Sequence, residues 1–130
     1  MSDISNIPIV YSCSGCSNLA QLAHDIALNL ERDGIAEMSC ISGVIGNVEP
    51  IKALAKSGRP IFVIDGCSLA CTKACLDACD LKAALYFDLS IFGLEKRNKE
   101  DSSFNESCIA LNRVYEELLK AGYAIQPETQ

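Results

Sequence analysis

The stretch Ile61-Phe62-Val63-Ile64, continued by Asp65-Gly66-Cys67, carries the strongest strand signal in the chain. Its apolar residues run without interruption and are mostly β-branched, which is typical of a strand buried on both faces of a parallel sheet. The Asp-Gly dipeptide favours a turn, and residues 68–81 then suit a helix. A buried strand followed directly by a helix predicts a βα unit.

The same order of a strand before a helix recurs on both sides of this unit. Residues 7–12 form a short apolar run ahead of a helical pattern over 17–34, which ends at a glycine. Residues 35–41 predict a second strand, and a short helix is expected over 47–58, with Asn47 as its cap. Three successive βα units therefore precede the last part of the chain.

The last part of the chain adds one strand and one helix. Residues 85–90 alternate apolar and polar side chains, as a strand does. The charged stretch 95–101 is interpreted as a solvated loop. Ser103 and Glu106 have the spacing of a capping box for a final helix. These elements predict an α/β fold, a single-domain three-layer sandwich with a mostly parallel four-stranded sheet, Rossmann-like or flavodoxin-like.

The composition of the chain argues against several classes of protein. Its 130 residues, 49% of them hydrophobic, suit one compact domain over 1–130. Nothing resembles a secretion signal and no apolar stretch approaches the roughly 20 residues of a membrane-spanning helix, so we expect a cytoplasmic protein with no membrane partner. A net charge of −6 opposes nucleic-acid binding. Eight cysteines in a reducing compartment indicate metal ligation or redox chemistry rather than disulfides.

Four cysteines have the spacing of a thiolate metal site. Cys13 and Cys16 form a C-x2-C pair, and Cys67 and Cys71 form a C-x3-C pair, both within the range of zinc-binding halves. Each pair follows a predicted strand, and ligands of parallel sheets bind beyond the carboxyl ends of the strands. The two pairs meet at one rim if the first and third strands are neighbours.

The other cysteines are weaker candidates. Cys67, Cys71, Cys75 and Cys79 form a row that would span about 18 Å on a helix, too far for one tetrahedral ion. Cys75, Cys79 and Cys108 are therefore interpreted as small buried hydrophobic residues, the usual role of a free thiol. Cys40, near the end of the second predicted strand, stays a further candidate ligand.

The motifs Cys13-Ser14-Gly15-Cys16 and Asp65-Gly66-Cys67, each after a strand, resemble the DGC-domain family, which is named for the second motif and thought to bind zinc. The resemblance also takes in Met38-Ser39-Cys40 with its glycine loop and residues 55–60, and it covers nearly the whole chain. It implies a zinc site but no particular physiological role, which could be structural, carrier or sensing.

Alternatives to a zinc site remain open. The same four cysteines would suit an iron–sulfur cluster, and Cys13 and Cys16 at a helix N-terminus would suit dithiol redox exchange. Asp65 is interpreted first as a turn residue. The second interpretation is that its side chain hydrogen-bonds one of the metal ligands without binding the metal, and the same role is expected for Ser14. His24, the only histidine, is expected to be structural. No catalytic residue is assigned, and the absence of a Ser-His-Asp set disfavours a hydrolase.

Overall fold

Four strands run in the same direction in the computed structural model, which describes residues 7–98 and 100–123. They lie in the order β2-β1-β3-β4. Their bounds are β1 (Ile9–Ser12), β2 (Glu37–Met38), β3 (Ile61–Asp65) and β4 (Leu85–Asp88). The α/β prediction is confirmed, and the order has the flavodoxin-like pattern. The expected single domain over 1–130 includes residues outside the described ranges.

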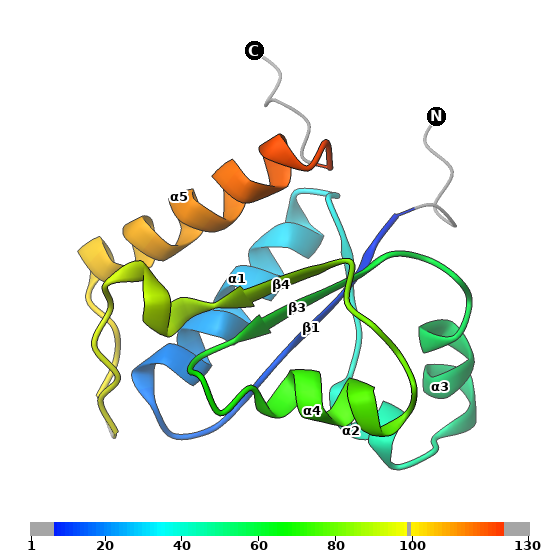
Figure 1. Ribbon diagram of the computed structural model, residues 1–130. Helices are drawn as coiled ribbons and strands as arrows, with labels where there is room; N and C mark the ends of the chain where they lie inside the picture. Colours follow the sequence, from blue (N-terminus) through cyan, green and yellow to red (C-terminus); the bar gives the residue numbers. More distant parts are fainter. Residues whose placement is uncertain (1–6, 99, 124–130) are drawn as a thin grey trace.

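Helices cover both faces of the sheet (Figure 1). Helices α1 and α5 pack on one face, and α2, α3 and α4 pack on the other. The helices are α1 (Asn18–Arg32), α2 (Ile41–Ile45), α3 (Glu49–Ala55), α4 (Cys71–Ala78) and α5 (Phe104–Lys120), with a 3-10 helix, η2 (Leu89–Phe92), after β4. This arrangement is the three-layer sandwich expected from repeated βα units.

Strands β1 and β3 are almost entirely apolar in sequence because both of their faces contact a hydrophobic core. All residues of both strands are buried, because alternate side chains point to opposite layers of helices. Val10 and Phe62 contribute to the core under α1 and α5. Ile9 and Val63 contribute to the core under α2, α3 and α4.

Strand β1 lies between β2 and β3, as the proposed rim requires. Ser12 pairs with Ile64 at the end of the β1–β3 ladder, so the two strands end side by side. The chain builds outward from β1 in one direction to β2 and in the other to β3 and β4. The switch in strand order therefore lies between β1 and β3, the place where sheets of this class bind ligands.

Two predicted helix starts are confirmed in detail. Ser17 caps α1, and its hydroxyl accepts a hydrogen bond from the amide of Ala20 at 3.0 Å. Ser103 and Glu106 form the predicted capping box at the start of α5. Both caps satisfy amides that have no partner within the first turn of a helix.

Other element bounds differ from the prediction. The second strand is only two residues long, because the chain leaves the sheet after Met38 and α2 begins at Ile41, directly after Cys40. Asn47 has a φ of 60° and does not cap α3, which begins at Glu49. Helix α4 begins at Cys71 rather than residue 68, because Ala70 has a left-handed backbone that a helix cannot include.

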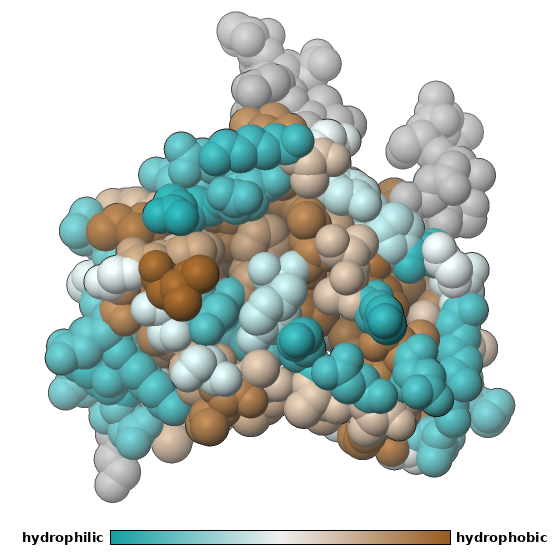
Figure 2. Space-filling view, in the orientation of Figure 1, coloured by the Kyte–Doolittle hydropathy of each residue, from teal (hydrophilic) through white to brown (hydrophobic). Residues whose placement is uncertain are grey.

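The surface is mainly hydrophilic over α5 and over the segment between η2 and α5 (Figure 2). Among residues 7–98 and 100–123, no helix combines the length and the apolar character that crossing a bilayer requires. Leu69, Ile91 and Phe104 are the most exposed of the large apolar side chains in this part of the chain.

Candidate functional site

Both cysteine pairs lie at the switch point of the sheet and line one open pocket of about 160 Å³. Cys13 and Cys16 come from the loop between β1 and α1. Cys67 comes from the turn after β3, and Cys71 is the first residue of α4. Ser14 and Asp65 line the same pocket. Two motifs about fifty residues apart in the sequence thus meet because β1 and β3 are neighbours.

The Cys13 thiol connects the two loops. Its Sγ accepts a hydrogen bond from the amide of Gly66 at 3.1 Å, and the amide of Cys13 donates to the carbonyl of Ile64 at 3.2 Å. Burial raises the pKa of Cys13 to about 11, although the hydrogen bond from Gly66 acts in the opposite direction. Cys67 and Cys71 lie close enough for their charges to raise the pKa of Cys13 further.

Gly66 lets the loop after β3 approach the first turn of α1. A Cβ atom at this position would lie 2.8 Å from the amide nitrogen of Ala20 and 2.9 Å from the carbonyl carbon of Leu19. These atoms belong to the backbone of a helix and have little freedom to move. Glycine is therefore needed here for close packing, rather than for a left-handed turn.

Asp65 is the last residue of β3 and is only 1% exposed. Its carboxylate accepts hydrogen bonds from the amides of Thr72 at 3.0 Å and Lys73 at 3.2 Å. These amides belong to the first turn of α4, where they have no partner within the helix. Asp65 is thus a remote cap that fixes the turn carrying Cys71, and not the simple turn residue that an Asp-Gly dipeptide suggests.

A third wall of the pocket comes from the segment between η2 and α5. Lys96 and Asn98 line the pocket, and Nζ of Lys96 lies 3.4 Å from Sγ of Cys67. Asn98 also forms an antiparallel bridge with Ser17. Most described residues of 95–101 are exposed, as expected for a solvated loop, but Lys96 and Asn98 in addition line the pocket. The sequence shows a charged run there, but nothing in it indicates which residue faces the cysteines.

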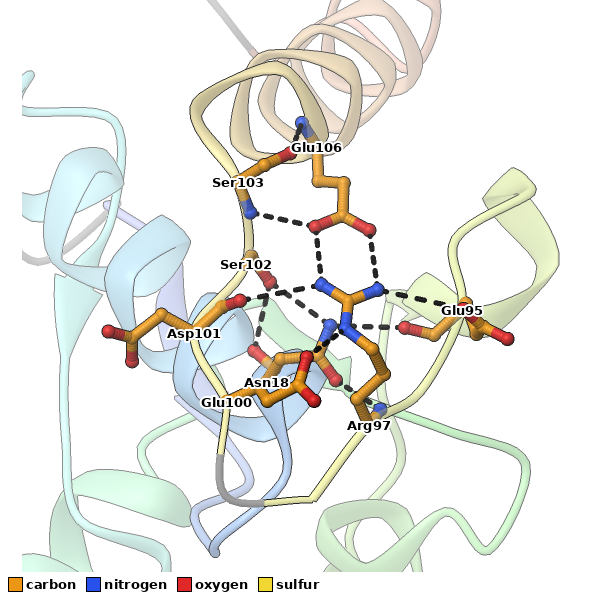
Figure 3. Close-up of polar contacts among 8 residues, drawn as sticks. All are labelled: Asn18, Glu95, Arg97, Glu100, Asp101, Ser102, Ser103 and Glu106. Carbon is orange, nitrogen blue, oxygen red and sulfur yellow. Dashed lines mark hydrogen bonds and ion pairs between the residues drawn. The ribbon is translucent and has the colours of Figure 1, made fainter.

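Arg97 links this segment to α5 through its side chain and to α1 through its backbone (Figure 3). Its guanidinium donates two hydrogen bonds to the carboxylate of Glu106, at 2.8 and 3.0 Å, and one to Glu100 at 2.9 Å. The Arg97 guanidinium, together with the Ser103 amide, lowers the pKa of Glu106 to about 2. The same carboxylates raise the pKa of Arg97 above its usual value.

Asn18 holds the same segment from the other side. It is fully buried at the start of α1, two residues after Cys16. Its side chain accepts a hydrogen bond from the amide of Arg97 at 2.5 Å and donates one to the carbonyl of Glu95 at 3.0 Å. The backbone amide of Asn18 also donates to the carbonyl of Arg97 at 2.8 Å.

The remaining candidates lie elsewhere. Cys40 is exposed, with its Sγ 2.9 Å from the hydroxyl of Ser42, and hydrogen bonds lower its pKa. Cys75, Cys79 and Cys108 are half-buried rather than buried as expected, and Cys79 packs against the core under α2, α3 and α4. His24 is exposed on α1 and does not line the cysteine pocket.

Comparison with known proteins gives the family. The DGC domain matches residues 9–114. The chain belongs to the DGC domain family. It is 54% identical over 95 residues to the "Anaerobic and virulence modulator AnvM" of Pseudomonas aeruginosa, covering 73% of this chain and 72% of that protein. No solved structure matches the chain.

The DGC motif has a separate physical role for each of its residues. Asp65 caps α4, Gly66 permits contact with α1, and Cys67 lines the pocket beside Lys96. The family resemblance inferred from the sequence is thus confirmed. All four pocket cysteines lie within the residues that the family covers.

The donor set of the pocket is soft and suits a thiophilic ion. Four thiols line it, and an amide and an ammonium group are placed to hydrogen-bond to their sulfurs. Such donors stabilise thiolates, the form in which cysteine binds metals. Among the residues that the structure describes, however, no three His, Cys, Asp or Glu side chains are already gathered closely enough to hold an ion. Metal binding would therefore draw the two loops together.

Proposed function

We propose that this protein binds one thiophilic metal ion, with zinc preferred, through the thiolates of Cys13, Cys16, Cys67 and Cys71. The observation that carries the proposal is that a C-x2-C pair and a C-x3-C pair line one pocket at the switch point of a parallel sheet. Four sulfur ligands would complete a tetrahedral site and leave no position for a catalytic water. The proposal is therefore one of metal binding, not of hydrolysis.

The role of such an ion would be structural, carrier or sensing. The chain has two cores of its own, so the fold does not depend on a metal to bury its apolar residues. The relative from P. aeruginosa is named as a modulator. Together these observations favour a sensing role, in which the metal changes the pocket loops without changing the fold.

An iron–sulfur cluster is the alternative with the same ligands, because such clusters also take four cysteine thiolates.

Dithiol exchange at Cys13 and Cys16 is less favoured. Cys67 and Cys71 line the same pocket, and this second pair favours a site of four ligands over an exchange that needs only two thiols.

Metal analysis of the anaerobically purified protein tests the proposal. We expect one zinc per chain and no visible absorption, and loss of the zinc when Cys13 or Cys67 is changed to serine. Cys108→Ser is the matched control, because Cys108 lies on α5 outside the pocket. Zinc that survives both pocket substitutions would contradict the assignment, and a brown sample containing iron would replace zinc with a cluster.

A further inference from the structure

We infer that Lys96 is a positioning residue of the cysteine site, and that its positive charge sets how tightly the bound metal ion is retained. The inference rests on the proposed function and adds a residue outside the cysteine motifs. It starts from one contact: Nζ of Lys96 lies 3.4 Å from Sγ of Cys67. Lys96 is a non-ligand, since an ammonium group has donors but no lone pair to offer a metal.

The Lys96 side chain is exposed, but the backbone on both sides of it is held in place by the fold. On one side of Lys96, the backbone of Glu95 is held by the buried Asn18 side chain. On the other side, Arg97 is fixed by the same asparagine and by two hydrogen bonds to Glu106 (Figure 3). Residues on both flanks of Lys96 are therefore tied to the start of α1 and the start of α5. This fixes the backbone from which Lys96 reaches the pocket.

Charge explains what Lys96 would do. Four thiolates around a divalent ion carry more negative charge than the ion neutralises. The chain as a whole is also acidic, with a net charge of −6. Asp65 adds a further buried carboxylate at the pocket wall. An ammonium group beside Cys67 offsets this excess and stabilises the metal-loaded site relative to the empty one.

The test compares the rate at which zinc-loaded full-length variants pass zinc to a chromophoric chelator. Lys96→Gln removes the charge and keeps much of the length, whereas Lys96→Arg keeps the charge. Lys56→Gln is the control, because Lys56 is exposed at the end of α3 and does not line the cysteine pocket. We expect Lys96→Gln to release zinc about fivefold faster at low salt, the upper end of what an exposed charge pair contributes.

Salt dependence separates charge from a structural role. The difference between wild type and Lys96→Gln should shrink at high salt, since salt screens exposed charges. Lys96→Arg and Lys56→Gln should release zinc at nearly the wild-type rate. Wild-type release by Lys96→Gln, or an equal defect in Lys96→Arg, would overturn this inference alone. A wild-type chain that takes up no zinc would overturn the proposed function and this inference with it.

Discussion

Gly66 determines how closely the two cysteine loops can approach. Its position against the backbone of Leu19 and Ala20 leaves no room for a Cβ atom. The hydrogen bond from its amide to Cys13 depends on the same approach. At the scale of single residues, the pocket thus depends on a glycine as much as on its cysteines.

Substitution of Gly66 by alanine should therefore destabilise the protein by about 1–3 kcal/mol, the usual cost of forcing extra atoms into a packed site. Urea unfolding followed by circular dichroism measures this change. Gly15→Ala is the matched control in the other loop, because a Cβ there would meet only the Cβ of Ala20 at an ordinary 3.7 Å. We expect that control to lie within about 0.5 kcal/mol of wild type. Equal effects of the two substitutions would contradict the close-packing account.

At the scale of elements, the junction between the 95–98 segment and α5 depends on the ionised carboxylate of Glu106. This carboxylate accepts hydrogen bonds both from Arg97 and from the amide of Ser103. Its pKa in the folded protein is about 2, against an ordinary value of 4.5. A depressed pKa means that ionised Glu106 stabilises the fold above pH 4.5, and that this contribution is lost as the pH falls toward 2.

The free energy of unfolding should accordingly be larger for wild type than for Glu106→Gln above pH 4.5. This difference in free energy should narrow as the pH falls toward 2. Denaturant titrations at several pH values measure it. Glu117→Gln serves as the control, since Glu117 also lies on α5 and forms an ion pair with the exposed Lys120. A difference for Glu106→Gln that does not vary with pH would show that its ionisation does not stabilise the junction.

At the scale of the whole molecule, the sheet could be predicted from the sequence because its signals are local. The run 61–64 is apolar throughout, and β1 and β3 are indeed buried on both faces. Placement of both cysteine pairs at one rim was predicted on the condition that β1 and β3 are neighbours, and the strand order meets that condition. The length of β2 could not be predicted, because its two residues depend on pairing with β1 rather than on their own pattern.

The third wall of the pocket could not be predicted, for a physical reason. Arg97 is held by Asn18 and Glu106, and these contacts join parts of the chain that no sequence period relates. Charged runs are usually solvated, so Lys96 gives no sign of its contact with Cys67. The role of Gly66 could not be predicted for a similar reason, because the atoms that it contacts belong to α1, which is far from Gly66 in the sequence.

The central claim is that four cysteine sulfurs of one pocket bind a single metal ion. X-ray absorption spectroscopy at the zinc edge, on protein purified without oxygen, tests it most directly because it reports both the metal and its ligands. We predict four sulfur ligands at about 2.3 Å and no nitrogen or oxygen ligand. A zinc ion bound mainly by nitrogen or oxygen at roughly 2.0–2.2 Å, or a protein that holds no zinc, would contradict the claim.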